Sequence, residues 1–229
     1  MKKVFLYLYP IKEYASAIFG SNEYYDSIGE KRPFDVLNEC IEKRYRARGY
    51  DIVWVLYPDK DSFGVEIKEN DKIILTDVLF TEASGYNEDG RKKKREDVKY
   101  PDVKLIIKQL GEDVEKVVLG GYHSSDCVRK TAEAAIDAGI DAVVDLDLTE
   151  IFVSVYRQTD YFNVEKEYNP TEYMEFRMRN LKDNMYKEDW PEWEETERRE
   201  FLETFSSPAY GFDKVKDKNH KVYQSQEER

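Results

Sequence analysis

The hydrophobic positions of the chain fall into runs without alternation, and these runs predict a buried parallel sheet. They cover residues 3–9 (KVFLYLY), 50–58 (YDIVWVLYP), 115–121 (EKVVLGG) and 140–152 (IDAVVDLDLTEIF). A strand that is covered on both faces has such an uninterrupted apolar sequence, because none of its side chains contacts water. A weaker run at 71–80 (DKIILTDVLF) predicts a third strand that bends away from the sheet.

Helical spacing of apolar residues fills the intervals between the strands. Residues 33–49 begin with Pro33, stop at Gly49 and carry Cys40 on their apolar face, which predicts a core position for that cysteine. Residues 100–111 and 124–139 predict two further helices. Residues 21–33 are interpreted as a polar, aromatic-rich connection, and residues 87–97 as a charged surface loop.

The order of these elements predicts the fold class. Strands that alternate with helices form a parallel sheet with right-handed crossovers and with helices on both faces. We therefore expect a three-layer α/β/α domain with a mainly parallel, Rossmann-like sheet over residues 1–155. Ligands of such sheets bind at the carboxyl ends of the strands.

The composition changes after about residue 155. Residues 156–229 are acidic, aromatic and helix-prone, with no strong strand signal. They predict a helical C-terminal extension that ends in a flexible tail over residues 213–229. The extension either wraps around the domain or forms a dimer contact through its large aromatic residues, Trp190, Trp193, Phe201 and Phe205.

Charge and composition argue against several classes of partner. The chain has 48 acidic and 36 basic residues and a net charge of -12, which argues against binding to nucleic acid or to an anionic membrane. No apolar run approaches the roughly 18 residues that span a bilayer. The N-terminus reads as a core strand rather than a signal peptide. Cys40 and Cys127 do not make a disulfide scaffold, so we expect a cytoplasmic protein without a thiolate metal site.

Cys127 carries the main candidate chemistry. It follows the predicted strand 115–121, the glycine pair Gly120–Gly121 and two serines, either of which is a good helix N-cap. In the first turn of a helix, free backbone N–H groups stabilise a thiolate. The N–H groups of Cys127 and Asp126 would also bind the oxyanion of an attacked carbonyl, and His123 is a candidate base. The alternative is a small hydrophobe at a crowded helix–sheet contact.

Residues 121–139 (GYHSSDCVRKTAEAAIDAG) resemble the nucleophile segment of the isochorismatase-like cysteine hydrolases, which include nicotinamidases and N-carbamoyl amidohydrolases. The strand "AVVDLDLT" that follows is similar to the family as well, and the wider order of elements is compatible over residues 3–155. The matching residues are Gly121, Cys127, Val128, Thr131, Ala132, Ala135 and Gly139.

The resemblance implies Cys127 as nucleophile, with an Asp after the first strand and a Lys near the third. This chain departs from the family at both positions. Tyr7, Leu8, Tyr9 and Pro10 stand where the Asp is expected, and Thr76 and Asp77 stand where the Lys is expected. Conceivable substitutes are His123 or Asp77 as base and Lys60 as cation. The expected pocket residues are Tyr7, Tyr9, Gly121, Tyr122 and Asp77, with the two tyrosines on one face of the strand.

Two weaker constellations have alternative interpretations. Asp145 and Asp147 at the end of the last strand could face the site or bind a metal, although only His123 lies nearby in sequence. The basic run at 91–95 (RKKKR) could touch a phosphate, but a solvated loop is the commoner explanation. No metal and no other cofactor is expected.

Two functions therefore remain open. The first is a divergent cysteine hydrolase that acts on a small amide or related carbonyl compound through Cys127. The second is a catalytically degenerate relative that binds a small molecule or a protein partner. A small-molecule ligand is expected in both cases, and the resemblance implies a homo-oligomer.

Overall fold

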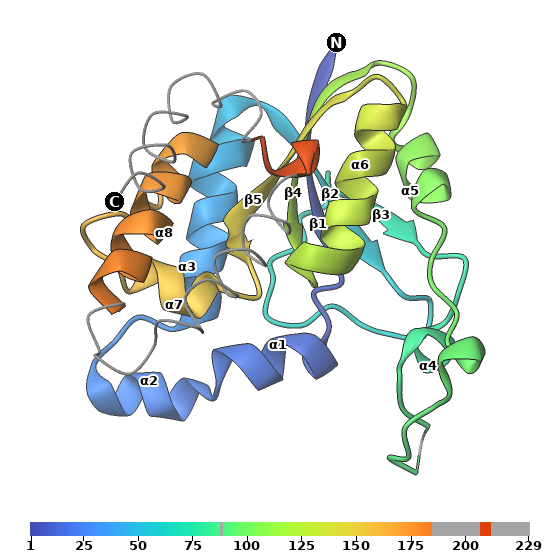
Figure 1. The fold of residues 1–229 in the computed structure, drawn as a ribbon, viewed down its shortest axis with the longest axis horizontal. Coiled ribbons are helices and arrows are strands. Elements are labelled where there is room, and N and C mark those ends of the chain that lie inside the picture. The colour runs from blue at the N-terminus through green and yellow to red at the C-terminus, as the bar shows by residue number, and fades with distance from the viewer. Residues whose placement is uncertain (88, 185–206, 212–229) are drawn as a thin grey trace, which may run out of the picture.

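Five parallel strands form the sheet of this protein. The computed structural model describes residues 1–87, 89–184 and 207–211. The strand order is β3–β2–β1–β4–β5, and helices cover both faces (Figure 1). The strands are β1 (Lys2–Leu8), β2 (Tyr50–Leu56), β3 (Lys72–Leu75), β4 (Val114–Gly121) and β5 (Asp141–Thr149). The predicted three-layer α/β/α class with a parallel sheet is confirmed.

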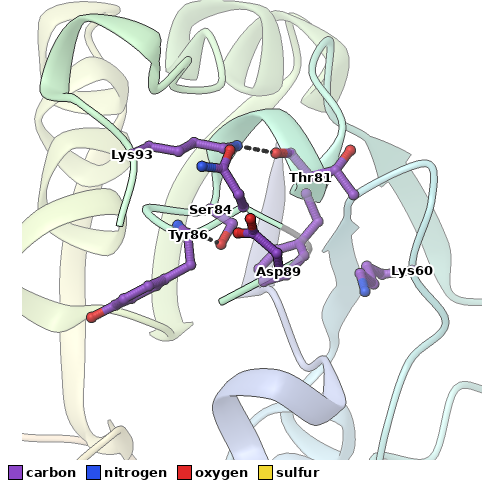
Figure 2. Close-up of a pocket in the computed structure, with 8 residues that line it drawn as sticks. Lys60, Thr81, Ser84, Tyr86, Asp89 and Lys93 are labelled. Carbon is purple, nitrogen blue, oxygen red and sulfur yellow. Dashed lines mark hydrogen bonds between the residues drawn. The ribbon is translucent and has the colours of Figure 1, made fainter. Parts of the chain in front are cut away.

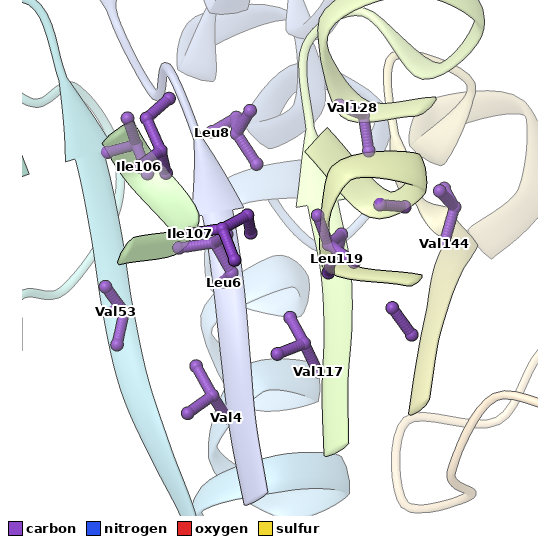
Figure 3. Close-up of a cluster of buried hydrophobic side chains, with 14 of the residues drawn as sticks. Val4, Leu6, Leu8, Val53, Ile106, Ile107, Val117, Leu119, Val128 and Val144 are labelled. Atoms are coloured by element: carbon purple, nitrogen blue, oxygen red, sulfur yellow. The ribbon is translucent and has the colours of Figure 1, made fainter. Parts of the chain in front are cut away.

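The uninterrupted apolar runs are explained by a core on each face of the sheet. The central strand β1 pairs with β2 on one side and with β4 on the other, so that Leu6 lies between Val53 and Leu119. Alternate residues of each strand point to opposite faces, and both faces are covered. Figure 3 shows one of the two cores, in which Leu6 and Leu119 meet Ile107 of the overlying helix.

The helices divide between the two faces. One face carries α5 (Val103–Leu110) and α6 (Arg129–Asp137). The other carries α1 (Lys12–Phe19), α3 (Pro33–Cys40) and α7 (Phe152–Tyr156). The α3 helix continues through a π turn (Ile41–Tyr45) and a 3₁₀ turn (Arg46–Arg48). Cys40 is fully buried in this layer, so its predicted core position is confirmed.

The predicted connection at 21–33 is wrong, because it contains a helix, α2 (Asn22–Ile28). Ser21 caps its N-terminus by accepting a hydrogen bond from Tyr24 N at 3.3 Å, and Gly29 ends it with a left-handed φ of 70°. Only Tyr25 of this helix is buried. A helix that buries one side chain shows almost no apolar periodicity, which is why the pattern did not reveal it.

Two predicted strands are shorter than expected. β5 ends at Thr149, whose hydroxyl donates to Leu146 O, and α7 begins at Phe152. β3 ends at Leu75, after which the chain turns into the short helix α4 (Phe80–Ala83). The predicted charged loop also contains a 3₁₀ turn (Arg95–Asp97).

The described part of the C-terminal extension packs on the domain of its own chain. It contains α8 (Pro170–Asn184) and a 3₁₀ turn (Pro208–Tyr210). The Tyr210 hydroxyl donates to Ser124 O at 2.9 Å, which ties the extension to the turn before Cys127. Trp190, Trp193, Phe201 and Phe205 lie outside the described residues. Among the described helices, none has the length and apolar character needed to cross a membrane.

Candidate functional site

Gly121 brings β4 unusually close to β1. It has a φ of 105°, and a Cβ atom there would lie 2.1 Å from Leu8 O. Only glycine fits this approach. Tyr122 N then donates to Leu8 O at 3.1 Å, and a cis peptide bond joins Tyr122 to His123. The turn that carries Cys127 therefore starts directly against the end of β1.

Cys127 lies in a π turn (Ser124–Val128) that leads into α6. His123 occupies the N-cap position without a capping side chain, so the expected serine cap is wrong. Ser124 instead gives its N–H and its hydroxyl to the Glu150 carboxylate, at 2.8 and 2.6 Å. The Asp126 N–H donates to His123 O at 3.1 Å. One of the two expected oxyanion donors is thus already engaged.

The surroundings of Cys127 favour its neutral thiol. Burial raises the pKa of Cys127 to about 11, and the negative charge of Asp126 adds to the effect. The Sγ atom lies 3.9 Å from Asp126 Oδ2, and that carboxylate is ion-paired with Lys130. The cation that would stabilise a thiolate is therefore held by a neighbouring carboxylate.

Tyr9 occupies the end of β1 where the resemblance places an Asp. It has a φ of 57°, which turns its side chain to the same face as Leu8. Its ring stacks on Tyr57 with centroids 4.6 Å apart, and its buried hydroxyl has no hydrogen-bond partner among the described residues. Burial raises the pKa of Tyr9, and the nearby Cys127 contributes.

Tyr7 and Tyr9 do not share a face as expected. Tyr7 lies in the opposite core, where its ring meets Trp54 at 5.7 Å and Tyr122 at 6.2 Å. The positive φ of Tyr9 breaks the alternation of the strand, because it rotates the chain after Leu8. The structure therefore brings Tyr9, but not Tyr7 or Tyr122, to the face of the sheet on which Cys127 packs.

The other candidate site residues have structural partners. His123 is exposed, and its ring lies edge-on to Tyr14 at 4.9 Å. The Asp77 carboxylate accepts a hydrogen bond from Asp102 N at 2.9 Å, just before α5. Lys60 is ion-paired with Glu13 and lies 4.6 Å above the Phe80 ring. None of these side chains forms a hydrogen bond with Cys127 in the described part of the chain.

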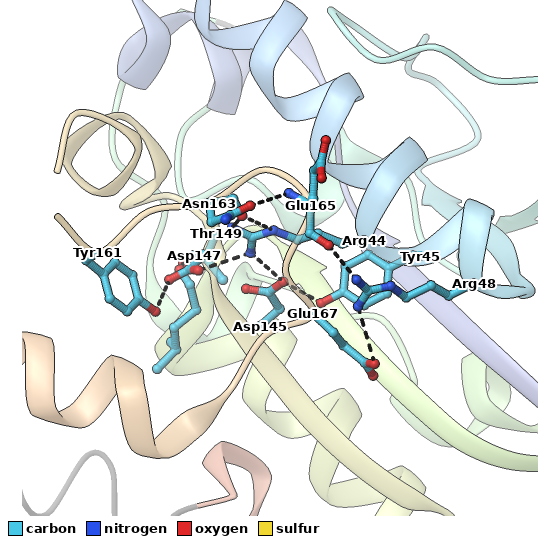
Figure 4. A network of polar contacts seen from close by, with 11 residues as sticks. Arg44, Tyr45, Arg48, Asp145, Asp147, Thr149, Tyr161, Asn163, Glu165 and Glu167 are labelled. Carbon is cyan, nitrogen blue, oxygen red and sulfur yellow. Dashed lines mark hydrogen bonds and ion pairs between the residues drawn. The ribbon is translucent and has the colours of Figure 1, made fainter. Parts of the chain in front are cut away.

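Asp145 and Asp147 are held by an arginine that sequence reasoning missed. The Arg44 Nη1 atom lies 3.0 Å from Asp147 Oδ2 and 3.5 Å from Asp145 Oδ2 (Figure 4). The Tyr45 hydroxyl donates to Asp145, and the Tyr161 hydroxyl donates to Asp147 at 2.9 Å. All three charged side chains are at most 5% exposed. Within the described residues, no group of His, Cys, Asp and Glu side chains is arranged to hold a metal ion.

Arg44 had a detectable signal in the sequence. It lies four residues after Cys40 on the apolar stripe of the predicted helix, where a charged residue requires a buried partner. Asp145 and Asp147 on a buried strand show the complementary anomaly. Burial raises the pKa of Asp145 to about 7 and the charge of Asp147 adds to the effect, while the Arg44 guanidinium opposes it.

An open pocket of about 660 Å³ lies at the carboxyl ends of β2 and β3 (Figure 2). Lys60 comes from the loop after β2, and α4 with the following hairpin supplies the rest. Asp59 caps α4 by accepting hydrogen bonds from Phe80 N at 2.6 Å and Thr81 N at 3.3 Å. The lining residues are Lys60, Phe80, Thr81, Ser84, Tyr86, Asn87, Asp89 and Lys93.

Aromatic side chains connect this pocket to the surroundings of Cys127. We call Tyr9, Tyr14, Tyr57 and Phe80 the aromatic layer. The Phe80 ring meets Tyr57 at 5.5 Å and Tyr14 at 5.7 Å, and Tyr57 in turn stacks on Tyr9. Burial raises the pKa of Tyr14 to about 12, so its hydroxyl stays protonated at neutral pH. Cys127 is partly buried against the same core as Tyr9 and Tyr57, and it does not line the pocket.

The comparisons with known proteins return only distant likenesses. No protein-family model matches the chain. No curated protein sequence matches it either. Pyrazinamidase of Pyrococcus horikoshii, solved in complex with zinc, is similar in structure, with 15% identity over 78% of this chain and 94% of that one and a TM-score of 0.41.

Two further solved structures show likeness of the same order. An isochorismatase-like hydrolase from Alkaliphilus metalliredigens has 16% identity over 79% of this chain and 82% of its own, with a TM-score of 0.37. MAR1 ribonuclease from Caenorhabditis elegans has 12% identity over 75% of this chain and 79% of its own, with a TM-score of 0.40. At these values the likeness carries no argument about activity. Isochorismatase-like hydrolases are nevertheless among the solved structures that are similar to this chain, as residues 121–139 led us to expect.

Proposed function

We propose that this protein binds a small molecule in the pocket at the carboxyl ends of β2 and β3, and that Cys127 does not act as a nucleophile. The observation that carries the proposal is the separation of the two features. The pocket is open and lined by mixed polar and aromatic side chains. Cys127 is a partly buried, neutral thiol outside the pocket lining.

The chemistry of Cys127 supports a loss of hydrolysis. With a pKa of about 11, about one thiol in 10⁴ is ionised at neutral pH, whereas catalytic cysteines keep pKa values of roughly 3.5–7.5. Tyr9 cannot take the role of a carboxylate base, because burial raises its pKa as well. Tyr9 therefore stands where the resemblance implies a base. Thr76 and Asp77 stand where it implies a cation, and both form hydrogen bonds with other parts of the chain.

The pocket has the features of a ligand site. Its volume lies within the ~300–1,000 Å³ typical of small-molecule sites. It lies at the edge of the sheet where ligands of parallel α/β domains bind. Phe80 and Tyr86 offer ring faces, and Thr81, Ser84 and Asn87 offer hydrogen-bonding groups. This combination suits a small ligand with one flat apolar part and one polar end.

One observation favours the hydrolase as the second candidate. Asp126 Oδ2 lies 3.9 Å from Cys127 Sγ, within reach of a proton transfer after a small movement. That carboxylate would first have to leave Lys130. A substrate would also have to reach the partly buried sulfur from outside the pocket.

Residue-resolved NMR titration with benzamide, benzoate and phenyl phosphate tests the proposal. We expect shifts at the amides of Thr81, Ser84 and Asn87 with at least one probe. Tyr86→Ala should weaken that binding several-fold, because Tyr86 is 59% exposed and its loss removes ring contact without disturbing the core. Tyr24→Ala, at a 53% exposed tyrosine outside the pocket, is the matched control.

The same samples report on catalysis. Incubation with benzamide should release no ammonia above the level seen with Cys127→Ala. Release that depends on Cys127, or shifts confined to residues around Cys127, would support the hydrolase instead.

A further inference from the structure

We propose that the ligand of this pocket is an anion, a small molecule whose flat apolar part carries a carboxylate or phosphate group. The inference rests on the proposed binding function and names the ligand class. The chain has a net charge of -12, yet residues 91–95 (RKKKR) are consecutive basic residues in one loop. One member of this run, Lys93, lines the pocket.

Two lysines face the pocket from different segments. Lys60 follows β2, and Lys93 belongs to the hairpin in which Tyr86 pairs with Lys92. Figure 2 shows Lys60 and Lys93 on opposite sides of Ser84 and Asp89. An ammonium group on a concave surface attracts anions, and Lys60 and Lys93 bring two such groups to the pocket, of which Lys60 is paired with Glu13.

Lys93 forms no salt bridge in the described part of the chain, although the nearby Glu82 carboxylate interacts with it electrostatically. Its Nζ atom donates to a neutral acceptor, the backbone oxygen of Thr81. A lysine in this position holds its ammonium group at the pocket and keeps donors free for a ligand, since an ammonium has three. Lys60 is balanced by Glu13, which lies outside the lining.

Asp89, the acidic residue among the described lining residues, is paired with a cation. The Asp89 carboxylate lies 3.4 Å from Arg91 Nε and accepts a hydrogen bond from Arg91 N at 3.0 Å. Its charge is therefore compensated by the first member of the basic run. Lys92, the member of the run that precedes Lys93, is exposed and does not line the pocket.

Neutral donors complete the polar end. Thr81 and Ser84 supply hydroxyl groups, and Asn87 supplies an amide, all within the same lining. Carboxylate and phosphate oxygens accept hydrogen bonds from such groups and from ammonium ions at once. The Tyr86 ring, which is 59% exposed, remains for the apolar part of the ligand.

A titration with matched charged and uncharged probes tests the inference. Benzoate and benzamide have nearly the same shape and differ in charge. We expect benzoate to bind about tenfold more tightly than benzamide at low ionic strength, and to lose that advantage in 0.5 M NaCl. Lys93→Gln should weaken benzoate about tenfold and leave benzamide unchanged. Phenyl phosphate, measured in parallel, distinguishes a phosphate from a carboxylate ligand.

Two variants sharpen the result. Lys92→Gln removes a neighbouring exposed charge that does not line the pocket, and should change benzoate affinity by less than about twofold. Lys60→Gln, at the opposite wall of the pocket, should also weaken benzoate binding. Equal affinities for benzoate and benzamide, or a benzoate affinity that neither Lys93→Gln nor Lys60→Gln lowers, would overturn the anionic ligand while leaving the binding function intact. If no probe shifts the pocket amides, the proposed function itself fails.

Discussion

Arg44→Leu is expected to destabilise the folded protein by about 3–5 kcal/mol, the cost of leaving buried carboxylates without their cation. The guanidinium is 2% exposed and lies between Asp145 and Asp147. Its Nε and Nη2 atoms also donate to Asn163 O, at 3.1 and 2.7 Å, so it fixes the start of the C-terminal extension to β5. Urea denaturation followed by circular dichroism measures the loss.

An exposed pair provides the control for this prediction. Arg32 is hydrogen-bonded to Asp26 at 2.9 and 2.7 Å, and both side chains are largely in water. Arg32→Ala is expected to leave the free energy of unfolding almost unchanged, because solvent screens such pairs. Adding Asp145→Asn and Asp147→Asn to Arg44→Leu should restore much of the stability. The account of the network is contradicted if Arg44→Leu costs no more than Arg32→Ala.

Asp145 should make stability depend on pH in the direction opposite to most carboxylates. Its pKa is raised in the folded protein from the ordinary 3.8 to about 7, chiefly by burial. The folded state therefore holds a proton that the unfolded state releases between pH 4 and 7. The contribution of Asp145 is fully present below about pH 4 and is lost as the pH rises to about 7. At 1.36 kcal/mol per pKa unit, the change is on the order of 4 kcal/mol.

Other carboxylates, such as Asp71, have lowered pKa values, and their contribution to stability changes with pH in the opposite direction. The measurement must therefore compare a variant with the unsubstituted protein at each pH. Asp145→Asn carries no titrating proton at this position. Its free energy of unfolding, relative to that of the unsubstituted protein, should rise between about pH 4 and pH 7 and then level off. A difference that stays constant over this range would show that Asp145 ionises normally in the fold.

The sheet and its covering layers were predictable because burial on both faces leaves a direct mark on the sequence. The runs around Leu6, Val53 and Leu119 are apolar without interruption, since each strand has neighbours above and below. Helix α2 left no such mark, because it buries only Tyr25. Local periodicity therefore reports on elements that enter the core and is silent on elements that rest on the surface.

The candidate site was predictable only in part, because its decisive contacts join distant segments. The turn with Gly121 and Cys127 follows from the local sequence, but the pKa of the thiol depends on how far the fold buries it. Arg44 and Asp145 are 101 residues apart, so their pairing could be suspected from two misplaced charges but not assigned. The pocket depends on a hairpin whose path the charged sequence did not indicate.

Tyr9 shows how one backbone angle changes a site. The sequence placed Tyr7 and Tyr9 on one face by alternation, but the φ of 57° at Tyr9 sends the two rings to opposite cores. A positive φ at a tyrosine has no signature in a single sequence, because such residues rarely adopt it. Of the two expected pocket tyrosines, only Tyr9 therefore lies in the core against which Cys127 packs.

The pH dependence of Cys127 alkylation by iodoacetamide tests whether Cys127 can act as a nucleophile. Cys127→Ala serves as control for Cys40, which is fully buried and whose pKa burial raises to about 12. We expect almost no alkylation at pH 7 and a rate that climbs toward a midpoint near pH 11 while the protein remains folded. A midpoint well below the reference of about 8.5 would mean a thiolate prepared for attack, and would contradict the proposal that Cys127 is not a nucleophile.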